Sequence, residues 1–229
     1  MSASVWKWCF GALLLFACAA DVSAVGGKSS SHKPIERYAT QSGDTIQLHP
    51  TEVTFQLPEA WRVSKVLLRP TGRELRKVNK DDFYLWGAPI ADAALNLRDC
   101  AVQVAPDNLT WVRVYIVDSA EEEILKRIQE KGRAAVYKMP FDASGHSSRG
   151  FQTEAVQEGR WQHVDIPYVV SFGDYNAGGF VSFYLRPVAG RELVLVFSYF
   201  GTGVRSTAER EDVLKSVVIP EVPTHTDPH

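Results

Sequence analysis

Hydrophobic and polar residues alternate with a period of two along the C-terminal third of the chain, a pattern typical of β-strands with one buried face. The alternation runs from Gln162 to Phe172, returns from Phe180 to Val188 and continues from Arg191 to Phe200. Glycine-containing turns separate the three segments, which predicts a meander of three antiparallel strands. We expect the first strand to lie at a sheet edge, because Pro167 has no backbone N–H to donate.

Four shorter β-leaning runs precede the meander. Cys100 to Val104 and Trp111 to Val117 are joined by Pro106-Asp107-Asn108, whose residues suit a turn, so this region predicts a hairpin. Thr45 to His49 and Glu52 to Leu57 predict two further strands or one interrupted edge strand.

Two segments have the start and stop signals of helices. The first runs from Ser119 to Lys131, opens with a capping box and is followed by Gly132. The second opens at Ser206 with another capping box and ends before Pro220. Strands and helices together predict an α+β fold, with an antiparallel β-sheet flanked by helices in a single domain at 45–219.

The N-terminal segment 1–24 has the pattern of a secretory signal peptide. A twelve-residue apolar run follows Lys7, and small residues suited to cleavage end the segment. The run is too short for a transmembrane helix, which needs about 20 apolar residues. Leu15-Phe16-Ala17-Cys18 also resembles a bacterial lipobox, so lipidation of Cys18 is the alternative to signal cleavage. Both alternatives predict an exported protein, periplasmic or secreted, whose only attachment to a membrane would be a lipid anchor.

Composition narrows the remaining choices. Segments 25–44 and 220–229 show no apolar period, which predicts a disordered linker and a disordered tail. The formal net charge of −2 gives no general attraction to nucleic acid, and the sequence has no nucleic-acid-binding motif. Of the three cysteines, Cys100 alone lies outside the signal segment, and its strand pattern predicts a core residue rather than a nucleophile.

A short opening motif, Phe55-x-Leu57-Pro58-x-x-Trp61, precedes the central strand and helix and the terminal meander with its apolar helix. This plan resembles the PsbP/Mog1-like proteins and their bacterial envelope lipoprotein relatives. The resemblance implies an antiparallel sheet flanked by helices, a non-enzymatic interaction role and no shared set of catalytic residues. It does not extend to the middle segment from Arg62 to Arg98.

A cluster of basic residues lies in this middle segment. Between residues 62 and 80 there are seven basic residues, spaced mostly three or four positions apart, and one acidic residue. The cluster consists of Arg62, Lys65, Arg69, Arg73, Arg76, Lys77 and Lys80. On a helix these side chains would form a stripe suited to an envelope protein or an anionic surface. Pro70 and Gly72 interrupt a helix, so the alternative is two strands, 66–68 and 74–75, around a turn with solvated basic side chains.

Two polar loops, 144–150 and 173–179, carry the remaining candidate chemistry. The first loop holds Ser147 but lacks the glycine spacing of a nucleophile elbow. His163 and Asp165 are two residues apart on one strand face, which brings an imidazole and a carboxylate together; a metal site would need a third ligand. With His146 they define a rival hypothesis, a secreted hydrolase or small-ligand carrier.

The sequence favours a non-catalytic exported envelope protein that binds a protein partner or an anionic surface through the basic cluster. It assigns no catalytic residue, cofactor or metal site, and it leaves the oligomeric state open.

Overall fold

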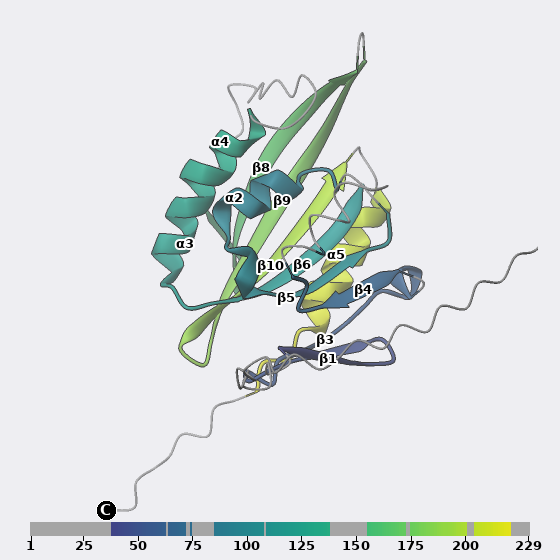
Figure 1. Cartoon of the computed structure of the whole chain (residues 1–229), viewed down its shortest axis with the longest axis vertical. Helices are drawn as coiled ribbons and strands as arrows, with labels where there is room; N and C mark the ends of the chain where they lie inside the picture. Colours follow the sequence, from purple (N-terminus) through teal and green to yellow (C-terminus); the bar gives the residue numbers. More distant parts are fainter. Residues whose placement is uncertain are drawn as a thin grey trace, which may run out of the picture. The chain divides into compact units, whose positions relative to one another are not determined.

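The computed structural model describes residues 38–62, 64–71, 74, 85–107, 109–137, 155–172, 175–200 and 204–220 (Figure 1). The predicted signal peptide with Cys18, the loop at 144–150 and the end of the chain from residue 221 lie outside these residues.

The larger of two sheets is antiparallel throughout and has the strand order β4-β5-β6-β10-β9-β8-β7. Its strands are β4 (Lys65–Leu68), β5 (Cys100–Ala105), β6 (Thr110–Val117), β7 (Val156–Glu158), β8 (Trp161–Phe172), β9 (Tyr175–Val188) and β10 (Arg191–Phe200). The predicted hairpin and the three-stranded meander are therefore confirmed. The pairing of β7 ends at His163 of β8, so Pro167 lies beyond it on the sheet edge, as its missing donor requires.

The smaller sheet consists of β1 (Ala39–Ser42), β2 (Thr45–Leu48) and β3 (Thr54–Gln56). Strands β2 and β3 follow the predicted pair of β-leaning runs. Strand β1 lies within the segment 25–44, where the sequence indicates a disordered linker. Its residues are ordered because they pair along their whole length with β2 and bury Ala39.

Helices α2 (Ala88–Ala94), α3 (Glu121–Arg127), α4 (Arg133–Val136) and α5 (Val204–Ser216) complete the α+β fold, together with the π-helical turn η3 (Ile128–Gly132) and two short 3-10 turns, η1 (Glu59–Trp61) and η2 (Leu97–Asp99). The fold class predicted from the sequence is confirmed.

The predicted helix end at Gly132 is wrong, because the helical path continues through α4 to Val136. A Cβ atom at Gly132 would lie 2.7 Å from Ile166 Cδ1. The glycine is needed for the close approach of the helix to β8, not for a left-handed cap. The predicted capping box is also wrong: α3 begins after Ala120, and within the described residues no side chain caps it.

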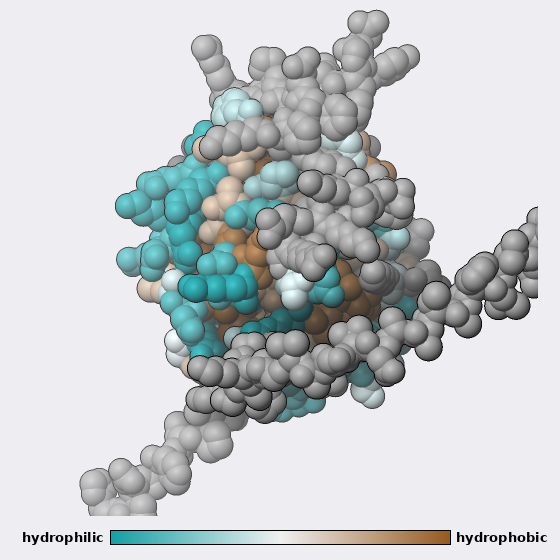
Figure 2. Space-filling view, in the orientation of Figure 1, coloured by the Kyte–Doolittle hydropathy of each residue, from teal (hydrophilic) through white to brown (hydrophobic). Residues whose placement is uncertain are grey.

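Two hydrophobic clusters lie on opposite faces of the seven-stranded sheet. Val194 and Val196 of β10 belong to the cluster shared with α2, α3, η3 and α4. Leu193 and Leu195 belong to the cluster shared with the smaller sheet and α5. Figure 1 shows α5 on the other side of the sheet from α2, α3 and α4, and Figure 2 shows hydrophilic residues gathered over α3. Alternate residues of β10 therefore pack on opposite sides of the sheet, one set against α2, α3, η3 and α4 and the other against the smaller sheet and α5.

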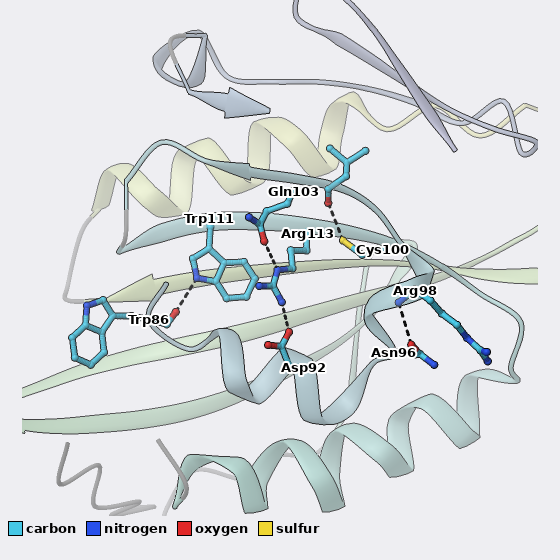
Figure 3. A network of polar contacts seen from close by, with 9 residues as sticks. Trp86, Asp92, Asn96, Arg98, Cys100, Gln103, Trp111 and Arg113 are labelled. Atoms are coloured by element: carbon cyan, nitrogen blue, oxygen red, sulfur yellow. Dashed lines mark hydrogen bonds and ion pairs between the residues drawn. The ribbon is translucent and has the colours of Figure 1, made fainter. Parts of the chain in front are cut away.

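A buried cation links α2 to the sheet (Figure 3). The side chain of Arg113 is 0% exposed, forms an ion pair with Asp92 of α2, and donates from Nε to Gln103 Oε1 at 2.7 Å. Its guanidinium lies 5.0 Å from the ring of Trp111, whose indole N–H donates to the carbonyl of Trp86 at 2.8 Å. These contacts pair Nε and Nη1 of Arg113 and the indole N–H of Trp111, which would be costly to bury unpaired.

Cys100 lies in the same region and is fully buried, which confirms the expectation of a core residue. Burial raises the pKa of its thiol to about 12. The thiolate that nucleophilic chemistry requires is therefore suppressed at neutral pH.

A buried carboxyl group at Glu192 makes the stability depend on pH. Burial, and then the neighbouring charge of Glu121, raise the pKa of Glu192 to about 7, and its Oε2 atom has no hydrogen-bond partner among the described residues. A folded-state pKa above the unfolded value means that stability is fully present below about pH 4.5 and falls as the pH rises through 7.

Replacing Glu192 with glutamine is expected to raise the free energy of unfolding at pH 8 by about 1 kcal/mol, since one pKa unit corresponds to about 1.4 kcal/mol and solvent screens part of the effect. The gain is expected to vanish at pH 4. Urea unfolding of both proteins at the two pH values checks this, and a gain of equal size at both would rule out the ionisation as its cause.

Candidate functional site

The basic cluster is only partly within the described residues. Arg62 forms ion pairs with Asp44 at 2.7 Å and with Glu59 at 3.5 Å, and the guanidinium of Arg69 lies 4.2 Å from the ring of Tyr38. Lys65 begins β4. Arg73, Arg76, Lys77 and Lys80 lie outside the described residues. Arg62 and Arg69 therefore make contacts within the chain. The role of the basic cluster in partner binding stays a prediction.

Of the two strands predicted in this segment, the structure confirms the first and contradicts the second at Glu74. Strand β4 matches the predicted strand at 66–68. Glu74, predicted in a strand, is helical, because its backbone N–H donates to Thr71 Oγ1 at 3.2 Å while its carboxylate accepts from the Thr71 N–H at 2.8 Å. This reciprocal pair is a capping box, and the Thr-x-x-Glu spacing was the signal in the sequence that indicates it.

The second predicted polar loop is mostly strand. Tyr175 to Gly179 belong to β9 and pair with β8 from Phe172 to Tyr168, so the connection between the strands is shorter than 173–179. His146 of the first loop lies outside the described residues.

The predicted meeting of His163 and Asp165 is confirmed. His163 Nε2 lies 2.9 Å from Asp165 Oδ1, and His163 Nδ1 lies 2.9 Å from Glu158 Oε2. In the register of β8 and β9, His163 is opposite Tyr184 and Asp165 is opposite Ser182. The imidazole stacks on the Tyr184 ring with 4.2 Å between centroids, and Ser182 Oγ donates to Asp165. We call Glu158, His163, Asp165 and Ser182 the His163 cluster.

Contacts within the His163 cluster shift the pKa of Asp165. Burial raises the pKa of Asp165, but the hydrogen bonds from His163 and Ser182 outweigh it and leave that pKa below its usual value. Both imidazole nitrogens face carboxylates, and only the imidazolium form can donate to both. The geometry therefore keeps Asp165 a carboxylate and places both imidazole nitrogens of His163 against acidic side chains.

This arrangement differs from a catalytic triad. A nucleophilic serine donates to the imidazole that activates it, whereas Ser182 donates to Asp165 and is 1% exposed. Within the described ranges, no group of three or more His, Cys, Asp and Glu side chains is arranged to hold a metal ion.

Helix α5 places a further cation over the same sheet face. The Arg210 guanidinium lies 5.7 Å from the Tyr184 ring and 5.6 Å from the Tyr199 ring. Burial raises the pKa of both tyrosines, and neither buried hydroxyl makes a hydrogen bond of ordinary geometry to a described residue, although Glu158 lies near enough to Tyr184 to raise its pKa further. Arg210 thus supplies positive charge beside the aromatic rings that α5 covers.

A groove of about 580 Å³ adjoins this cluster, between the β7–β8 turn, β9 and the C-terminal half of α5. Its lining mixes an apolar wall with charged side chains. The residues of this α5 groove are Glu158, Gly159, Arg160, Trp161, Tyr184, Arg186, Glu211, Leu214, Lys215 and Val217.

Trp161, which is 7% exposed, forms part of the groove wall and meets Tyr184 edge-on at 6.4 Å between centroids. Glu158 of the His163 cluster lies in the lining, so the ion cluster and the groove are continuous. The sequence interpretation named neither Arg160 nor Arg186. The period-two pattern of β8 and β9 was the only signal, since it places Arg186 on the same face as Tyr184.

No helix in the described part of the chain is long and apolar enough to cross a membrane.

A comparison with solved structures gives a weak likeness. No protein-family model and no curated protein matches the sequence. Among solved structures, LpqN of Mycobacterium tuberculosis, which is involved in cell envelope biogenesis, is similar to this chain with 10% sequence identity, a TM-score of 0.38, and coverage of 79% of this chain and 87% of LpqN. A TM-score of this size does not indicate a shared function.

Proposed function

We propose that the protein is an exported, non-catalytic binding protein and that the α5 groove binds its ligand, a small molecule with an apolar part. Export rests on the signal-peptide pattern of residues 1–24. The groove carries the proposal, because its volume of about 580 Å³ falls in the usual range of ligand sites and its lining combines apolar wall with charged groups.

The His163 cluster supports binding over catalysis. General base catalysis needs a nitrogen that is free to take a proton, and both nitrogens of His163 are held by carboxylates. The cluster instead fixes Glu158 at the groove and leaves Tyr184 held beneath the stacked imidazole. Of the earlier rival hypothesis, the proposal retains a small-ligand carrier and omits the hydrolase.

The basic cluster at 62–80 is the weaker candidate for the binding surface, since Arg62 is already paired with two acids. The resemblance to PsbP/Mog1-like proteins remains part of the proposal. It is supported by the terminal meander and the helix α5 that follows it.

A direct test uses two probes with the same twelve-carbon chain, laurate and dodecyl-β-D-maltoside, below their micelle-forming concentrations. We expect at least one to bind with a stoichiometry of one in isothermal titration calorimetry. Replacing Leu214 with tryptophan fills the groove and is expected to weaken binding by about tenfold or more, whereas Ala208→Trp, at an exposed position of α5 outside the lining, is expected to leave it unchanged.

A second measurement does not depend on the folding of a variant. In the wild-type protein, the indole N–H signal of Trp161, assigned by Trp161→Phe, is expected to shift on saturation with the bound probe. Failure of both probes to bind, or binding that leaves both the Trp161 signal and the Leu214→Trp affinity unchanged, contradicts the proposal.

A further inference from the structure

Two arginines of the α5 groove have no acidic partner in the described part of the chain. Arg160 is exposed in the turn between β7 and β8, and Arg186 is half-buried on β9. Neither forms an ion pair with a described residue. Burial, and then the positive charge of Arg160, lower the pKa of Arg186, and both arginines line the same groove.

Each of the two acids that line the groove lies against a basic side chain other than Arg160 and Arg186. Glu158 faces His163 Nδ1 at 2.9 Å, and Glu211 accepts from Lys215 Nζ at 3.0 Å. The hydrogen bond from Lys215 lowers the pKa of Glu211, so that pair stays charged and matched. Arg160 and Arg186 are therefore the cations of the lining that form no ion pair with a described residue.

Arg186 is also held in position. Its guanidinium lies 5.9 Å from the ring of Trp161, which is itself packed against Tyr184. A planar guanidinium with several N–H donors matches a carboxylate or a phosphate group, and two neighbouring guanidinium groups without a counter-ion favour an anion between them. On the other side of the lining, Leu214 and Val217 of the α5 end supply apolar contact.

We infer that the ligand of the α5 groove is an anionic amphiphile, whose carboxylate or phosphate group binds Arg160 and Arg186 and whose apolar part packs against Trp161, Leu214 and Val217. This inference rests on the proposed function, because it specifies the ligand class of that same groove. A fatty acid and a phosphate monoester of a lipid share the required chemistry.

The test compares three probes with a twelve-carbon chain by isothermal titration calorimetry on the full chain: laurate, dodecyl phosphate and neutral dodecyl-β-D-maltoside. We expect one or both anions to bind about tenfold or more tightly than the maltoside, because hydrogen bonds between two charged groups are stronger than those to a neutral group. Raising the salt concentration is expected to narrow the difference by screening the charges. The tighter anion identifies the source of the head group.

Substitutions of Arg160 and Arg186 test whether these side chains cause the preference for anionic probes. Arg160→Gln changes an exposed turn residue and is expected to weaken anion binding several-fold without affecting the fold. The double variant Arg160→Gln with Arg186→Gln is expected to remove the preference for anions, and Arg186→Lys to restore part of it. Arg98→Gln, at a position 81% exposed outside the groove, is the matched control and is expected to change nothing.

The binding results distinguish the inferred ligand class, an anionic amphiphile, from the proposed function of the groove as a ligand site. If the maltoside binds in the groove as tightly as the anions and the arginine variants leave all three affinities unchanged, the inference is wrong and the proposed function stands. If none of the probes binds, both are wrong. Anion binding that survives in Arg160→Gln and in the double variant also overturns the inference.

Discussion

Replacing Asp92 with alanine is expected to lower the free energy of unfolding by about 3 kcal/mol or more. The substitution leaves the guanidinium of Arg113, whose side chain is 0% exposed, without its counter-ion. Removing one partner of a buried ion pair is costly because the remaining charge stays in a low-dielectric interior. The Gln103 side chain still accepts from Arg113 Nε, but it is neutral and does not compensate the charge.

Urea unfolding of the wild type and the variant measures the loss, and Asp118→Ala is the matched control. Asp118 pairs with Arg191 at 2.7 Å, but that pair is on the surface, with side chains 75% and 35% exposed, so its loss is expected to cost less than about 1 kcal/mol. The double variant Asp92→Leu with Arg113→Met removes both charges and is expected to recover most of the loss. Equal losses for Asp92→Ala and Asp118→Ala would show that the buried pair has no special role.

Replacing Gly179 with alanine is expected to destabilise the protein by about 3 kcal/mol, at the upper end of the range for overpacking. A Cβ atom at this position would lie 2.5 Å from the backbone oxygen of Tyr199 and 2.5 Å from Tyr168 Cζ. The backbone of β10 cannot yield without disturbing its ladder with β9, in which Gly179 pairs with Phe200.

The neighbouring glycine provides the control for this prediction. At Gly178 the nearest atom to an added Cβ is Tyr168 O at 3.9 Å, and the residue is exposed, so Gly178→Ala is expected to stay within about 0.5 kcal/mol of the wild type. Thermal and urea unfolding of both variants measures the difference in their stability. A Gly179→Ala protein as stable as Gly178→Ala would mean that the strands are not packed as closely as the structure shows.

Local patterns predicted the strands well because a period of two is a local property of the sequence. The alternation marked the extents of β8 and β10 and the antiparallel order of the three strands, but it missed the first five residues of β9. Helix α2 was missed because its seven residues, rich in alanine, are too few to show a helical period. Gly132 was misinterpreted as a stop signal because its neighbour Ile166 is more than thirty positions away in sequence.

The site was predictable in part. The spacing of His163 and Asp165 indicated one strand face, and the structure brings these two side chains together. Their partners Ser182 and Arg210 come from strand register and helix docking, which are set by long-range packing that the local pattern does not contain. Counting charges between residues 62 and 80 also overlooked Asp44, an acid distant in sequence that pairs with Arg62.

The most direct test of the central claim is a crystal structure of the protein with laurate or dodecyl phosphate bound, whichever of the two binds more tightly. We predict that its anionic head group lies within hydrogen-bonding distance of the guanidinium groups of Arg160 and Arg186 and that the alkyl chain lies along Trp161 and Leu214 in the α5 groove. An empty groove at a saturating probe concentration, or a probe bound elsewhere on the protein, would contradict the account.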